Sequence, residues 1–207
     1  MLRPALWAAG AVAAALLTLG VNGTLASWTQ AIIGNSTNTV ATGSAVILQE
    51  VSGANTCTSS SSTTNSSTCA TINKYGGTAT PLTPGTSQVT TVTFTNTGAQ
   101  NASTFVVTPG TCTSTPSTPN LCTNGDLTVA VQCSPGATFV LANAWTDLAY
   151  TPAAAPPTTA KTHTVASGDL NAGASWTCQF TVALVSGAGP TDQGITVSQP
   201  ITWTLNK

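Results

Sequence analysis

Alternation of apolar side chains with threonine and serine is the pattern that most limits what this chain can fold into. In "VTTVTFTNTG", Val92 and Phe94 occupy alternate positions and threonines stand on either side of them. In "ITWTLN", Ile201, Trp203 and Leu205 alternate with polar residues in the same way. A period of two places the apolar side chains on one face of a β-strand and the polar ones on the other. These segments therefore predict strands that bury one face.

Strand patterns of this kind recur along the chain, whereas helix patterns are nearly absent. The predicted strands are rich in Val, Ile, Thr, Phe and Trp, and they cover residues 39–51, 87–98, 103–110, 126–133, 136–143, 175–185 and 194–206. Clusters of Gly, Pro, Asn and Asp lie between them and supply turn conformations. We therefore predict an all-β fold, a single antiparallel sandwich or jelly roll.

The N-terminal region has the pattern of a secretory signal peptide. The apolar run 5–19 reads "ALWAAGAVAAALLTL", and Arg3 and the chain's own amine supply the positive charge before it. This run is shorter than the ~20 apolar residues that a membrane span requires. Small residues at Thr24 and Ala26 match what a signal peptidase recognises, so we place the cleavage between Ala26 and Ser27. An uncleaved anchor helix is the alternative.

Removal of the predicted signal peptide, 1–26, leaves 27–207, a length that suits one domain. Charged residues make up 4% of the chain and the formal net charge is −1, whereas roughly a quarter of the residues in ordinary soluble proteins are charged. The few Lys and Arg residues are scattered, so we predict no partnership with nucleic acid or, after cleavage, with a membrane. So little charge also means little repulsion between copies of the chain.

Six cysteines behind an export signal predict three disulfides and an oxidising, extracellular or cell-surface destination. The connectivity stays open at this level. Proximity along the chain favours the pairs Cys57 with Cys69, Cys112 with Cys122, and then Cys133 with Cys178. The polar tract 55–69 is predicted as a surface loop held at its base by a disulfide, and 150–161 as an extended connector.

The titratable residues form no recognisable catalytic motif. His163 lies in the alternating segment "KTHTV" and is interpreted as a strand side chain. The acids are interpreted as loop and turn residues that bond to backbone amides, and they are Glu50, Asp126, Asp147, Asp169 and Asp192. GxSxG, HExxH, P-loop, GxGxxG and CxxC motifs are all missing from the sequence. We predict no enzyme activity, cofactor or metal, and an exported hydrolase that uses His163 is the least favoured alternative.

Four of the five tryptophans lie beyond the predicted cleavage site. Trp176 and Trp203 alternate in phase with other apolar residues, which predicts that they pack in the core. Trp145 is interpreted as an exposed aromatic residue, which would suit a monomeric binding module or adhesin that holds a glycan. Trp28 precedes "TQAIIG", an apolar strand-like segment that becomes ordered only by joining a sheet.

Short motifs along the chain resemble those of the TasA/camelysin family, whose members are exported through signal peptides of the SipW-dependent kind. They are Gly23-Thr24-Leu25-Ala26, then Trp28, then "TGSAVIL" (42–48), "LTPG" (82–85) with "VTFTNTG", and Gln193-Gly194 before the last predicted strand. In the family, the first of these elements ends the signal peptide and an aromatic residue soon follows it. The remaining elements belong to strands and turns of the folded body. Family members are commonly charged and poor in cysteine, and this chain differs in both respects.

The resemblance implies a jelly-roll subunit of an extracellular fibre at a cell surface or in a biofilm matrix. In such fibres, the N-terminal strand freed by cleavage inserts into the sheet of the next subunit, and this head-to-tail contact propagates into a filament. The expected polymerisation strand here is Ser27, Trp28, Thr29, Gln30, Ala31, Ile32, Ile33 and Gly34. The expected partners are copies of the same chain, an accessory fibre subunit and, during export, signal peptidase. Several edge strands could accept the donor, and the sequence does not choose among them.

The metalloprotease label of the camelysin branch does not carry over to this chain. A chain with a single histidine and no HExxH motif lacks the residues that such a zinc site needs.

Overall fold

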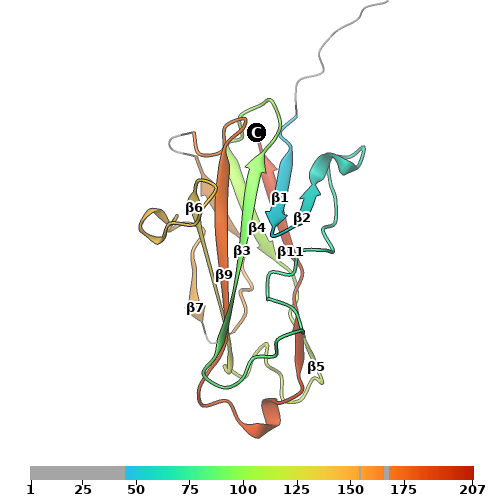
Figure 1. Cartoon of the computed structure of the whole chain (residues 1–207), viewed down its shortest axis with the longest axis vertical. Helices are drawn as coiled ribbons and strands as arrows, with labels where there is room; N and C mark the ends of the chain where they lie inside the picture. Colours follow the sequence, from blue (N-terminus) through green and yellow to red (C-terminus); the bar gives the residue numbers. More distant parts are fainter. Residues whose placement is uncertain (1–44, 154, 166–167) are drawn as a thin grey trace, which may run out of the picture. The chain divides into compact units, whose positions relative to one another are not determined.

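The alternating segments pair into antiparallel sheets (Figure 1). The computed structural model describes residues 45–153, 155–165 and 168–207, which belong to one compact unit, Gly43–Lys207. Every strand pairing within these ranges is antiparallel, and the regular structure there consists of strands and short 3-10 helices. The prediction of an all-β antiparallel fold is confirmed. The predicted cleavage site, Ala26–Ser27, and the predicted polymerisation strand, 27–34, lie outside the described residues.

The larger sheet has six strands in the order β2-β1-β3-β9-β6-β7. They are β1 (Leu48–Ser52), β2 (Asn55–Thr58), β3 (Ser87–Asn96), β6 (Leu127–Pro135), β7 (Tyr150–Ala153) and β9 (Ser175–Leu184). The strands β3 and β9 form its centre, with a pairing that runs from Ser87 opposite Ala183 to Thr95 opposite Ser175.

The second layer consists of a three-stranded sheet in the order β11-β4-β8 and a separate pair, β10-β5. Their strands are β4 (Thr104–Pro109), β5 (Thr113–Thr115), β8 (Lys161–Thr164), β10 (Thr196–Ser198) and β11 (Ile201–Asn206). The short 3-10 helices are η1 (Ser59–Ser61), η2 (Leu141–Asn143) and η3 (Pro190–Asp192). None of the helices in the described ranges is long and apolar enough to cross a bilayer.

An aromatic cluster joins the two layers into a sandwich. Phe94 of β3 and Trp176 of β9 come from the larger sheet, and both are fully buried. Phe105 of β4 lies against both of them, with ring centroids 5.3 Å from Phe94 and 4.9 Å from Trp176. Trp203 of β11 also packs against Phe94, with ring centroids 4.6 Å apart. Because Phe105 and Trp203 belong to the smaller sheet, these contacts place the core between the two sheets.

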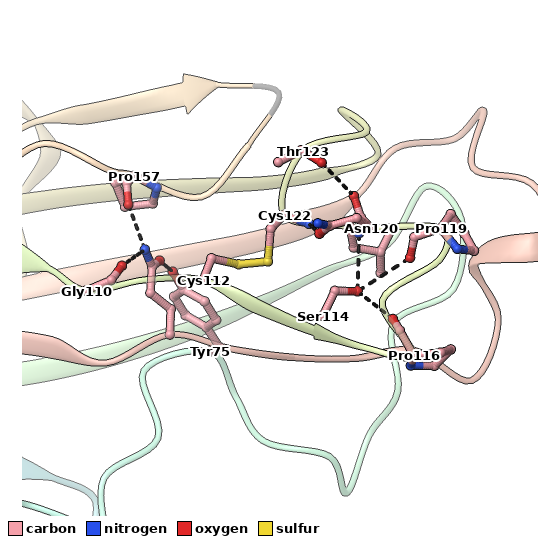
Figure 2. The surroundings of a disulfide bond; sticks show 12 residues. Tyr75, Gly110, Cys112, Ser114, Pro116, Pro119, Asn120, Cys122, Thr123 and Pro157 are labelled. Atoms are coloured by element: carbon pink, nitrogen blue, oxygen red, sulfur yellow. Dashed lines mark hydrogen bonds between the residues drawn. A yellow bond between two sulfur atoms is a disulfide. The ribbon is translucent and has the colours of Figure 1, made fainter.

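Three disulfides stabilise the described fold, and they join the pairs that proximity along the chain favours. Cys133 and Cys178 lie directly opposite each other on β6 and β9 and are fully buried. The other two close the polar loops Cys57–Cys69 and Cys112–Cys122. Figure 2 shows the second of these loops, in which the Ser114 hydroxyl donates to the carbonyl of Pro116 at 3.0 Å. Three disulfides are compatible with an extracellular protein.

The strand predicted at 136–143 is wrong. Gly136 adopts a positive φ of 97° directly after β6, so the chain leaves the sheet at this point. The segment continues through bends into η2, and Leu141 is 63% exposed. Its apolar residues have no neighbouring strand within the described residues, and β propensity alone does not create one.

The polar stretches also contain strands that were not expected from their sequences. The tract 55–69 begins with β2, which pairs with β1, and the connector 150–161 begins with β7, which pairs with β6. Each of the two is an outermost strand of the larger sheet.

The inward face of β3 should carry much more of the stability than its outward face. We expect Phe94→Ala to lower the free energy of unfolding by about 3–5 kcal/mol, because the side chain is fully buried among other rings. On the same strand, Val89 is 56% exposed, so Val89→Ala should change the free energy of unfolding by no more than about 0.5 kcal/mol. Urea unfolding of both variants measures the difference, and equal effects would contradict the assigned core.

Candidate functional site: an open groove along the last strand

A groove of about 740 Å³ runs along β11, on the side of the sandwich where β11 faces β1. Within the described residues, β11 pairs with β4 alone, so its other edge presents backbone N–H and C=O groups without a strand partner. All residues from Ile201 to Leu205 line the groove, inward-facing and outward-facing ones alike. Side chains from both faces of β11 line the groove because the groove borders the edge of the strand and not one of its faces.

The floor of the groove is apolar. Ile201, Trp203 and Leu205 face the core from β11, yet all three remain only half-buried and line the groove. Val46 and Leu48, at the start of the described chain, line it from the opposite side and are also half-buried. A row of inward-facing apolar side chains that stays partly open marks a surface suited to covering by another apolar element.

Trp203 connects this floor to the core of the sandwich. Its ring centroid lies 4.6 Å from that of Phe94 and 5.5 Å from that of Phe105, with the latter pair stacked. Trp176 is fully buried, as predicted, whereas Trp203 packs against the core with one side towards the groove. The groove therefore reaches the main aromatic cluster.

A buried ion pair forms the polar part of the floor. Glu50, in the middle of β1, contacts the Nζ of Lys74, and the side chains are only 9% and 12% exposed, respectively. The interpretation of Glu50 as a loop or turn residue is wrong. Glu50 sits on a strand, and its partner lies in a distant loop that the alternation pattern does not reveal. The pair fixes the segment around Lys74 against β1.

The start of the described chain is fixed at one end of the groove. The Asn65 side chain donates to the carbonyl of Val46 at 2.8 Å, and the backbone N–H of Leu48 donates to the Ser59 hydroxyl at 3.0 Å. Ser59 in turn donates to the side-chain oxygen of Asn65 at 2.7 Å. The polar tract behind β2 therefore holds Val46 and Leu48 in place as one wall of the groove.

Further along the groove, a polar cluster links three segments of the chain. Gln199, between β10 and β11, accepts a hydrogen bond from the Tyr75 hydroxyl. Its Nε2 donates to the carbonyls of Gly110 at 2.8 Å and Pro157 at 2.7 Å. Figure 2 shows Tyr75, Gly110 and Pro157 converging beside the Cys112–Cys122 disulfide. Burial raises the pKa of Tyr75 well above its usual value, so the hydroxyl remains a donor.

A second cavity of about 620 Å³ adjoins the groove at Tyr75. Tyr75 and Val197 line both spaces. Much of the second cavity is apolar, and its lining includes Leu82, Leu121, Leu127, Val182, Leu184 and Ile195.

His163 lies on β8, as a strand side chain, in agreement with its prediction. Its Nδ1 is 2.9 Å from the Asp147 carboxylate, and its ring stacks on Trp145 with centroids 3.8 Å apart. Asp169 lies 3.9 Å from Nε2. Trp145 is only 8% exposed, so its interpretation as an exposed glycan-binding residue is wrong. It is buried because the imidazole covers its face, a contact between distant segments.

The remaining acids support loops rather than a reaction centre. Asp192 accepts the backbone N–H of Gly189 at 2.9 Å, as predicted for a turn residue. Asp126 accepts from the Asn124 side chain at 2.6 Å, and Asp147 binds His163 rather than a backbone amide. In the part of the chain that the structure describes, no group of three or more His, Cys, Asp or Glu is placed to share a metal ion.

No protein-family model matches the chain, and no curated protein sequence matches it. The function must therefore be inferred from the geometry of the groove and from the sequence motifs.

The Glu50–Lys74 pair should behave as a unit. We expect Lys74→Met to destabilise the fold by about 3–5 kcal/mol, because it leaves a buried carboxylate without its cation. The double variant Glu50→Leu with Lys74→Met should recover most of that loss, since two apolar side chains of similar size need no charge partner. Urea unfolding of the two single variants and the double variant measures the coupling. Strictly additive effects would show that the two side chains do not interact.

Proposed function

We propose that the chain is a secreted structural subunit that polymerises head to tail into extracellular fibres of a cell surface or matrix. Residues 27–34 of one copy act as the donor strand, and the groove along β11 of the next copy receives them. The observation that carries the proposal is the edge of β11, which lacks a strand partner within the described residues and borders a half-buried apolar row. The sandwich of antiparallel sheets also suits the jelly-roll topology that the family resemblance implies.

The donor is long enough to cover the exposed edge of β11. Eight extended residues span about 26–29 Å, whereas the strand β11, Ile201–Asn206, is about 20 Å long. A strand laid there could bond to the β11 edge with its backbone and cover the apolar floor with alternate side chains.

The composition of the donor also suits this groove. Trp28, Gln30 and Ile32 share one face of an extended strand, and Ala31 and Ile33 share the other, with no charged side chain between 27 and 34. The side chains of such a strand can enter the groove without burying an unpaired charge, and the charged amine that cleavage creates lies at its end, on Ser27. Sparse charge on the body leaves little repulsion between successive copies.

The two alternatives have less support. A glycan-binding module was expected to use Trp145, and that ring is covered by His163. A hydrolase would need a nucleophile beside His163, and within the described residues the buried Nε2 of His163 has no hydrogen-bond partner.

Deletion of Ser27 to Gly34 from the mature chain should abolish filaments and leave a folded monomer. The monomer should fold because its core and its three disulfides lie beyond residue 45. Negative-stain electron microscopy and size-exclusion chromatography measure the two outcomes, with the intact mature chain as the control. Filaments of normal form after the deletion would refute the donor role.

A charge placed in the groove should block assembly, whereas the same charge beside it should not. Leu205 lines the floor and is half-buried, whereas Thr108 on the neighbouring strand β4 is exposed and does not line the groove. We expect Leu205→Asp to reduce the yield of filaments at least about tenfold, because an incoming strand would bury the carboxylate. Thr108→Asp is the matched control and should still assemble. Equal assembly of the two variants would place the receiving site elsewhere.

A further inference from the structure

We propose that, before assembly, residues 27–34 of each copy occupy the groove of their own chain, and that filament growth exchanges this segment between copies. The inference rests on the proposed function, because it takes the β11 groove as the site that receives the segment. It adds a form of regulation that the fibre model alone does not contain, since each subunit would begin in a capped state.

The first observation is the point at which the chain enters the fold. Val46 and Leu48 line the groove directly, so the described chain begins at the groove itself. Leu205 also lines the groove, and Figure 1 draws the C-terminus and the start of β1 at the same end of the body. The bond from the Thr97 N–H to the carbonyl of Ile47, at 2.8 Å, holds this entry point against the end of β3.

The second observation is the length of chain between the donor and the entry point. Residues 35–44 follow the donor and precede the described chain. They span up to about 33–36 Å when extended, which exceeds the length of β11, about 20 Å. The connection is therefore long enough for the donor to turn back and lie in its own groove.

Because the donor is tethered to its own body, the groove of the same chain is the first one that it meets. Short flexible linkers give effective concentrations in the millimolar range. A separate subunit at micromolar concentration would have to compete with a segment that is about a thousand times more concentrated locally. Self-capping should therefore precede exchange in a dilute secreted protein.

The direction of the donor differs between the capped state and the filament. A donor that turns back from the entry end runs antiparallel to β1, and so parallel to β11, because β11 runs towards that end and β1 runs away from it. In a head-to-tail filament the donor enters from the Val197 end of the next copy, which makes it antiparallel to β11. Antiparallel pairing is slightly more stable per residue than parallel pairing. Exchange would therefore proceed towards the better pairing.

Binding of a synthetic peptide tests this inference. A fluorescent peptide of residues 27–34 is added to the mature chain, 27–207, at a concentration below that needed for filaments. The same titration is made with a variant that carries Ile32→Asp and Ile33→Asp, which disables its own donor. Fluorescence anisotropy should show at least about tenfold tighter apparent binding to this variant, because its groove lacks a competing segment. A control with Thr37→Asp and Thr39→Asp, outside the donor, should bind like the mature chain.

The outcomes separate the two proposals. Equal affinity of the peptide for the mature chain and the donor-disabled variant would overturn self-capping and leave the groove as the receiving site. A peptide that binds neither protein would overturn the receiving role of the groove itself, and with it the mechanism of assembly proposed above.

Discussion

Contact between Trp203 and the rings of Phe94 and Phe105 is the interaction on which both the fold and the groove depend. It attaches the last strand to the core, and it places that strand at the margin of the smaller sheet. Because only one side of Trp203 packs inwards, the apolar row to which it belongs is held in place without being covered. Trp203 therefore belongs to both the core and the open surface, and a substitution of this residue would change both.

Much of the sheet follows from the period of two, and the errors have a common physical origin. The strands β3, β4, β6, β9 and β11 bury one face, so their sequences must alternate. Four of them lie within predicted segments, and β6, Leu127–Pro135, extends two residues beyond the segment predicted at 126–133. The strands β2 and β7 border the larger sheet, where alternation is not required, and their sequences "NTCT" and "YTPA" carry no such signal. Proline is tolerated at such an edge because it need not donate to a second neighbour.

The groove was only half predictable, for a different reason. Alternation places Ile201, Trp203 and Leu205 on one face, and that face does point inwards. Whether an inward face is covered depends on segments far away in the sequence, here the loop around Lys74 and the tract behind β2. The same limit explains Trp145, whose burial depends on His163 from another strand. Local patterns indicate which way a side chain faces, but not what it meets.

The outer surface of the larger sheet shows how this chain manages with so few charges. Hydroxyl groups pair across neighbouring strands there, as between the half-buried side chains of Thr95 and Ser175 at 2.8 Å. A second pair, Thr93 with the buried Thr177 at 3.3 Å, lies beneath this surface. Such neutral pairs, unlike exposed ion pairs, are not weakened when dissolved ions screen electrostatic forces. A sheet face held together by hydroxyl pairs therefore keeps its cohesion whether the surrounding solution is nearly fresh water or brine.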